Sequence, residues 1–284
     1  MAYDLEYLES GCTLNYDPAT NFDGAAWGYI TDYIIWVLGI IFTIALFVKQ
    51  GFSPNKGFVP FYFLLSTTAY GVGGIIHQLV ERKDDPAYEP LWTLSHTFAI
   101  LGYASLLAVA ISYAFPGKKF RIYGCLVLGV ALSLIAEFTD TGFVVAQIVG
   151  LTVQLMMGIF WSKDAIRQKT DSASPGVYWA SIWKVMSVVF QVVGASLYLA
   201  GRVSCVYEDC FENCFFPNPF VFNQNAVFHF GLIMSYALLG IAEIFDPTLL
   251  KLNAPAGEGA NSDFVENVKA QGGDDDDYED DANC

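Results

Sequence analysis

Charged residues are scarce in this chain of 284 residues. Asp, Glu, Lys and Arg make up 15% of it and hydrophobic residues 54%, whereas a soluble domain usually carries about 25% charged residues. So few charges leave little surface for water to solvate, which excludes an ordinary water-soluble domain. The chain also lacks the polar and apolar alternation of a transmembrane β-barrel, so its membrane spans should be helices.

Other absences narrow the function classes. The chain has no P-loop and no dinucleotide-binding glycine pattern. It has only three histidines, too few for two haems that each take two His ligands. The last long apolar segment, 223–245, contains no lysine, so nothing there supports a retinal Schiff base.

Basic residues are outnumbered, and the formal net charge is −15 at pH 7. Residues 252–284 hold ten Asp and Glu against one Lys, which supplies −9 of this charge. We expect this acidic segment, rich in Gly, Asp, Asn and Ala, to be a disordered tail. An acidic chain does not favour nucleic acid as a partner. We expect membrane lipid as the partner of the remainder, and the sequence names no protein partner.

Seven segments approach the length of about 20 mostly apolar residues that a spanning helix needs. They are 27–48, 58–80, 91–115, 122–138, 142–161, 177–201 and 223–245. Segment 122–138 is the weakest, and it could instead form a re-entrant pair with 142–161. The fold class predicted is all-α, a polytopic membrane protein with a seven-transmembrane-helix bundle over 27–248. Residues 1–26 precede the bundle as an extracytoplasmic segment, and 249–284 follow it as the tail.

Loop charges predict the orientation, because Lys and Arg gather on the cytoplasmic side. The loops after the first, third and fifth segments hold eight of them: Lys49, Lys56, Lys118, Lys119, Arg121, Lys163, Arg167 and Lys169. The opposite side holds three: Arg82, Lys83 and Arg202. The N-terminus should therefore be outside and the C-terminus cytoplasmic. The sequence does not choose between the plasma membrane and an internal membrane.

Four cysteines fall on the predicted outer side: Cys12, Cys205, Cys210 and Cys214. In an oxidising compartment they predict two disulfides with three possible connectivities. Cys12 has no partner in its own segment, so we expect it to bond to Cys205 or Cys210. Zinc is the weaker interpretation of the Cys spacing, since no His lies near.

The three histidines, His77, His96 and His229, each lie within about 5–9 Å of the predicted outer boundary. Ionisable groups inside a membrane are costly and usually face the bundle interior. Three imidazoles in one layer are the ligands of a catalytic zinc site, which keeps its fourth position for water. The alternative is that each His is a structural hydrogen-bond partner at a helix contact.

A hydrolytic site also needs a general base, and carboxylates are available at this level. Glu81 lies one turn beyond His77, in line with a stripe of Ser66, Tyr70, Gly73 and Gly74. Asp140 is the second candidate, Glu137 and Asp32 lie at a similar depth, and Glu81, Glu137 and Asp140 could simply be solvated loop ends. Other polar residues are expected to be structural: Lys184 snorkels, Glu243 lies at the interface, and Gln154 and Gln191 bond between helices.

The seven-helix topology and the placement of His77 and His229 resemble the membrane hydrolase superfamily of alkaline ceramidases and progestin/adipoQ receptors. Those proteins have Ser-x3-His late in the second helix, an Asp in the third and His-x3-His early in the seventh. Here Gly73 replaces the Ser, His96 replaces the Asp, and Asn225 replaces the first His of the last pair. The resemblance implies a zinc-dependent enzyme that cleaves lipid amides.

Two functions follow from these patterns. The first is a zinc-dependent hydrolase of a lipid amide or ester, with His77, His96 and His229 as metal ligands and Glu81 or Asp140 as the base. The second is a non-enzymatic seven-helix receptor, transporter component or scaffold whose histidines are structural. The substrate stays open in both.

Overall fold

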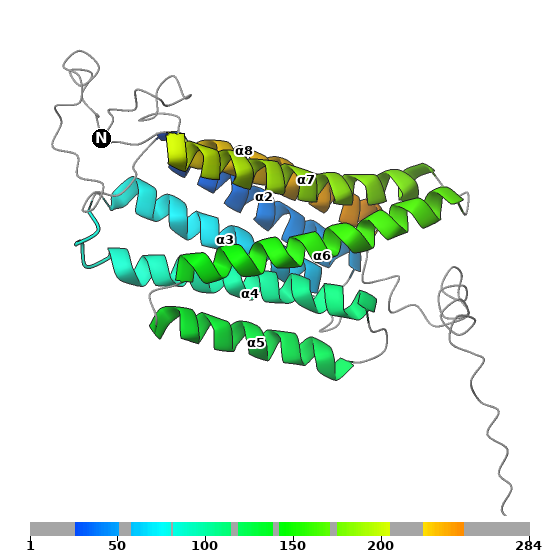
Figure 1. Ribbon diagram of the computed structural model, residues 1–284, viewed down its shortest axis with the longest axis horizontal. Coiled ribbons are helices and arrows are strands. Elements are labelled where there is room, and N and C mark those ends of the chain that lie inside the picture. Colours follow the sequence, from blue (N-terminus) through cyan, green and yellow to red (C-terminus); the bar gives the residue numbers. More distant parts are fainter. Residues whose placement is uncertain are drawn as a thin grey trace, which may run out of the picture.

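The computed structural model describes residues 26–50, 58–80, 82–114, 119–138, 142–170, 175–204 and 224–246. These ranges contain seven helices and no strand (Figure 1): α2 (Ala26–Gln50), α3 (Phe58–Leu79), α4 (Tyr88–Ala114), α5 (Lys119–Phe138), α6 (Gly142–Thr170), α7 (Pro175–Ser204) and α8 (Gln224–Phe245). The all-α class predicted from the sequence is confirmed. The four outer cysteines, Glu81 and Asp140 lie outside the described residues.

Six of the helices are long and apolar enough to cross a membrane, which is the architecture of a multi-pass membrane protein. They are α2, α3, α4, α6, α7 and α8. The one predicted span that is not among these six is 122–138, the weakest segment in the sequence, which corresponds to α5. α5 carries Lys119, Arg121 and Glu137 within its 20 residues, so its apolar stretch is short.

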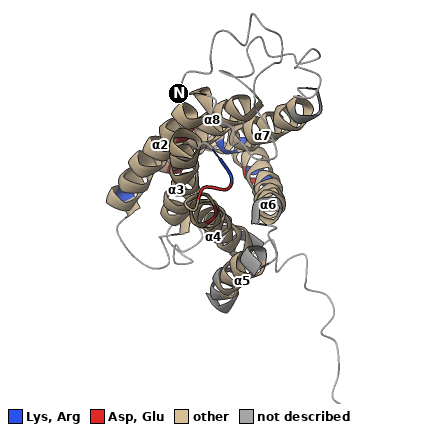
Figure 2. Ribbon diagram, turned by 90° about the vertical axis from the view of Figure 1, so that its left-hand side faces the viewer, with Lys and Arg blue, Asp and Glu red and all other residues tan. Residues whose placement is uncertain are grey.

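The principal helix contacts form a ring. α2 packs on α3, α3 on α4, α4 on α6, α6 on α7, α7 on α8, and α8 returns to α2. α5 lies outside this ring, against α4 and to a lesser extent α6, and Figure 2 shows it at the margin of the bundle. The six helices of the ring are the six candidate spans.

Helix α2 shows how the sequence sorts residues between the core and the outer face. Ile35, Phe42 and Leu46 are buried in the ring, while Val37 and Ile41 on the opposite face are 52% and 53% exposed. Water does not favour an exposed apolar stripe at helical spacing, whereas lipid does. The same outward apolar stripe recurs on α6 and α7 at Ile148, Leu155, Ile159, Val189 and Val193.

Helix α6 is longer than its predicted segment, which ended at residue 161. It continues to Thr170 through Lys163, Arg167 and Lys169. Backbone hydrogen bonds continue where the apolar run stops, because charged residues are good helix formers in water. The criterion of about 20 mostly apolar residues therefore predicted the apolar part of α6 and missed its polar extension.

The short connection between α3 and α4 is stabilised by its own acidic residues. The Asp85 carboxylate accepts a hydrogen bond from the Ala87 backbone N–H at 2.8 Å, and the Tyr88 N–H donates to the Asp85 carbonyl at 2.9 Å. These contacts satisfy donors at the start of α4, as an N-cap does. Beside them, the Arg82 guanidinium bonds to both Asp84 oxygens at 2.8 and 2.9 Å and lowers the Asp84 pKa from its ordinary value.

Helices α7 and α8 approach closely through paired glycines. A Cβ atom at Gly231 would lie 2.8 Å from the Phe190 carbonyl oxygen and 3.0 Å from the Gly194 Cα. Small residues at such a crossing let backbones pack within van der Waals contact in a membrane. We expect Gly231→Ala to destabilise the protein by about 1–3 kcal/mol through overpacking, measured as a lower Tm in detergent.

The matched control for this prediction is Gly124→Ala in α5, because a Cβ at Gly124 would meet nothing within 4 Å. This control should leave Tm unchanged or slightly raised, since Ala favours a helix over Gly by about 1 kcal/mol. Equal Tm values for the two variants would contradict a tight α7–α8 crossing at Gly231.

Candidate active site

His229 lies in the second turn of α8 and faces the start of α2. Its Nδ1 atom lies 3.0 Å from Thr31 Oγ1, 3.3 Å from the Gly28 carbonyl oxygen and 3.3 Å from Asp32 Oδ1. His229 is 3% exposed and Asp32 is 1% exposed. A buried carboxylate is therefore placed directly against a buried imidazole near the ends of two spanning helices.

The partners of Nδ1 determine which ring nitrogen carries the proton. The Gly28 oxygen and the Asp32 carboxylate can only accept a hydrogen bond. The Thr31 hydroxyl lies 2.5 Å from the Trp27 carbonyl oxygen and 2.9 Å from that of Gly28. Because its proton is donated to these backbone carbonyls, its oxygen can accept from the ring. Nδ1 is thus the protonated nitrogen of neutral His229, and Nε2 carries the lone pair.

His77 lies near the end of α3, on the same end of the bundle. Its Nε2 atom accepts a hydrogen bond from the Asn225 side-chain amide at 3.3 Å. Asn225 precedes His229 by one turn of α8, and the imidazoles of His77 and His229 are close enough to interact electrostatically. Asn225 joins the two histidines, and it stands where the resembled superfamily has a third one.

Two glycines in α3 bring α2 close enough to complete this cluster. A Cβ at Gly73 would lie 3.5 Å from Asp32 Oδ2, and a Cβ at Gly74 would lie 3.1 Å from Asp32 Cβ. Larger side chains would push the Asp32 carboxylate away from α3. Four residues of the stripe predicted on this helix, Ser66, Gly73, Gly74 and His77, are buried.

We call Asp32, His77, Asn225 and His229 the outer cluster, because they lie at the predicted outer end. Both histidines were predicted from the sequence as site residues, and Asp32 only as one of several available carboxylates. Asn225 had no predicted role. One signal in the sequence could have pointed to Asn225: it stands where the resembled superfamily has a metal-binding His. An amide can occupy that place without binding metal.

The third histidine is placed differently. His96 is half-buried on α4, and its ring packs edge-on against Trp92 with centroids 4.5 Å apart. Within the described ranges, no group of three or more His, Cys, Asp or Glu is close enough to hold a metal ion. The lone pair of His77 Nε2 is also engaged by Asn225.

The donor types of the outer cluster suit zinc, since two imidazoles and a carboxylate form known catalytic sites. The contacts of Asp32, His77 and His229 do not fit a bound ion, because three ligands are not assembled there. The three-histidine zinc site stays a prediction, as do the roles of Glu81 and Asp140.

Aromatic and amide side chains fill the ring beneath the outer cluster. The Tyr70 ring lies edge-on to His229 at 5.6 Å, and the Tyr236 ring lies 6.5 Å from Tyr70 and 5.8 Å from Tyr62. Two glutamines bond to tyrosine hydroxyls across helices, as expected: Gln154 to Tyr62 at 2.7 Å and Gln191 to Tyr103 at 3.2 Å. These two hydrogen bonds join α6 to α3 and α7 to α4 inside the ring.

A second buried ionic group lies at the opposite end of the bundle. The Lys184 ammonium on α7 lies 3.1 Å from Glu243 Oε1 and 3.6 Å from Asp246 Oδ2, and it also donates to the Asp246 carbonyl. Lys184 is 2% exposed and Glu243 is 1% exposed. The expectation that Lys184 snorkels and that Glu243 lies at the interface is wrong, because the two charges pair inside the bundle.

Comparison with known proteins assigns the chain to a family. Residues 27–201 match the model of a family of unknown function, DUF6962. The chain belongs to the DUF6962 family. The match includes Asp32, His77 and His96 and ends before α8, which carries Asn225 and His229. No curated protein and no solved structure matches this DUF6962 protein.

Proposed function

We propose that this DUF6962 protein is a membrane-embedded hydrolase that cleaves an amide or ester of a lipid-like substrate at the outer cluster. The observation that carries the proposal is the contact between His229 Nδ1 and Asp32. An imidazole held through Nδ1 by a buried carboxylate presents its other nitrogen as a general base. The position of the cluster adds support.

Depth in the membrane favours a lipid-like substrate. His77 lies two residues from the end of α3, and His229 five residues from the start of α8, or about 3–8 Å along the helix axes. This depth corresponds to the boundary between hydrocarbon and head groups, where the carbonyl groups of membrane lipids lie.

The chemistry assigned to the cluster balances as an addition and elimination. His229 Nε2 takes a proton from water as the hydroxide oxygen adds to the substrate carbonyl carbon. Asn225 supplies an amide N–H of the kind that stabilises an oxyanion. The intermediate then collapses, and the leaving amine or alcohol takes the proton back from His229. Asp32 is a positioning residue, since it acts through His229.

Metal content tests whether the predicted zinc takes part. Purified protein that carries about one zinc per chain, lost in His77→Ala, His96→Ala and His229→Ala alike, would support the three-histidine site. We expect His96→Ala to retain the zinc content and the activity of the wild type, because His96 packs against Trp92 and not in the outer cluster. Loss of zinc in all three variants would contradict a site built on Asp32 and His229 alone.

A second candidate function is favoured by the burial of the cluster. Asp32 and His229 are almost entirely inaccessible, and each has polar partners within the bundle. That is also how structural polar groups are satisfied at helix contacts. In a receptor, transporter component or scaffold, substitutions at His229 would change stability and leave no hydrolytic activity to lose.

The proposed orientation places the cluster on the outer side, and it has its own test. It depends on eight Lys and Arg on one side against three on the other. In intact cells that carry the protein at their surface, we expect a tag at the N-terminus to be cut by external protease. A tag at the C-terminus should be protected until the membrane is permeabilised. The opposite pattern would place the outer cluster on the cytoplasmic side.

A further inference from the structure

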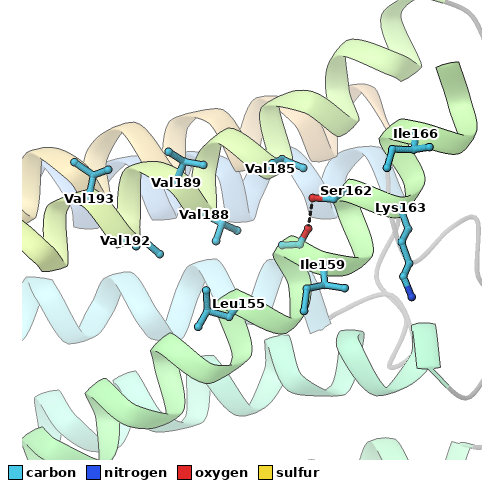
Figure 3. Close-up of a pocket in the computed structure, with 11 residues that line it drawn as sticks. Leu155, Ile159, Ser162, Lys163, Ile166, Val185, Val188, Val189, Val192 and Val193 are labelled. Carbon is cyan, nitrogen blue, oxygen red and sulfur yellow. Dashed lines mark hydrogen bonds between the residues drawn. The ribbon is translucent and has the colours of Figure 1, made fainter.

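An elongated apolar groove runs between α6 and α7 on the outer surface of the ring. Its volume is about 530 Å³, and Figure 3 shows the side chains along it. The lining comes from both helices and includes Leu155, Ile159, Ile166, Val185, Val189 and Val192. In the order of helices around the ring, the α6–α7 pair lies opposite the α2–α3 pair. The groove is therefore separate from the outer cluster.

Gly158 of α6 and Val188 of α7 form the floor of the groove. A Cβ at Gly158 would lie 3.3 Å from Val188 Cγ1, so the glycine lets Val188 pack closely against α6. The one hydroxyl in the lining, that of Ser162, donates to the Gly158 carbonyl at 2.7 Å. Its polarity is satisfied within α6, and the interior of the groove is left apolar.

A charged residue joins the lining of the groove where the apolar part of α6 ends. Lys163 is exposed and belongs to the lining. In Figure 3 the Lys163 ammonium points away from the valines, as expected for a charge at the boundary of the hydrocarbon. An occupant should therefore be apolar along the valines and negatively charged at its end.

The size of the groove suits one acyl chain. From Leu155 to Ile166 the groove extends along twelve residues of α6, or about 16 Å. A volume of about 530 Å³ is in the range of small-molecule sites.

We propose that this groove binds one acyl chain of an anionic phospholipid, with the phosphate of its head group beside Lys163. The chain lies along Val185, Val189 and Val192, and the ammonium group neutralises the phosphate. By the predicted orientation, the bound lipid belongs to the cytoplasmic leaflet. The proposal does not depend on the hydrolase, because it uses other helices and other residues.

Native mass spectrometry of the purified full chain in detergent tests this site. The probes are phosphatidylglycerol and phosphatidylcholine with identical acyl chains. We expect the wild type to bind one phosphatidylglycerol about five-fold more tightly than phosphatidylcholine, as one Lys near a charged lipid surface provides. Lys163→Gln should remove this preference, and Val189→Trp should remove binding of both lipids.

Two matched controls separate the groove from the rest of the lipid-facing surface. Lys49→Gln changes an exposed lysine at the end of α2, and Val37→Trp enlarges a valine that is 52% exposed on the same helix. Both should bind like the wild type, and Tm should show that every variant is folded. Equal binding of the two lipids by the wild type, or equal losses in test and control variants, would overturn the proposal.

Discussion

Lys184→Ala should destabilise the folded protein by about 3–5 kcal/mol, far more than the substitution of an exposed lysine. The substitution leaves the carboxylates of Glu243 and Asp246 buried without the cation that lies 3.1 and 3.6 Å from them. A buried charge that loses its partner costs several kcal/mol, because water cannot reach it. Thermal unfolding in detergent should show a Tm lower by many degrees.

The control for this prediction is Lys49→Ala, at an exposed position on α2, where the Tm should be close to that of the wild type. The combined variant Lys184→Met, Glu243→Met and Asp246→Leu should recover much of the loss. Replacing a whole buried ionic group by well-packed hydrophobic residues of similar volume is often neutral or stabilising. If Lys184→Ala unfolds at the wild-type temperature, the ionic group contributes nothing to the fold.

Asp32→Asn should lower kcat for hydrolysis by about 10²–10⁴-fold and change KM little. The amide keeps the size of Asp32 but can donate to His229 Nδ1, which in the wild type lies 3.3 Å from a carboxylate oxygen. The ring would then favour a proton on Nε2, the nitrogen that must act as the base. Since the protein remains folded, the loss should appear in kcat rather than in the amount of folded protein.

The readout that separates catalysis from packing is the comparison of Asp32→Asn with Thr31→Val. Thr31 is equally buried and also lies beside His229 Nδ1, at 3.0 Å, but it carries no charge. Its substitution should reduce kcat much less. Equal reductions would assign Asp32 a structural role.

Hydropathy and length were sufficient to predict the helices, because a spanning segment is defined by its own composition. They were insufficient for α5, where charged residues at both ends shorten the apolar run. The sequence also identified which helix carries each histidine. Which neighbours a histidine meets depends on the rotation of its helix and on the order of helices around the ring, which local sequence does not determine.

The outer cluster shows this difference directly. His77 and His229 were expected in one site and do lie at one end, where Asn225 joins them. The third histidine expected there, His96, is not part of the cluster. His96 lies eight residues from the start of α4, or about 12 Å, and packs on Trp92. Lys184 and Glu243 were assigned to the interface because each was interpreted alone, and only the packing of α7 against α8 makes them partners.

The most direct test of the proposed function is hydrolysis by the purified protein in lipid vesicles. The probes are a fluorogenic fatty-acid ester and a fluorogenic fatty-acid amide, and the rate of release is compared for the wild type, His229→Gln and His96→Gln. We expect the wild type and His96→Gln to release product from one of the two probes at similar rates, and His229→Gln to be slower by at least about 10²-fold. No release by the wild type from either probe, or equal rates for the wild type and His229→Gln, would contradict an active site built on Asp32 and His229.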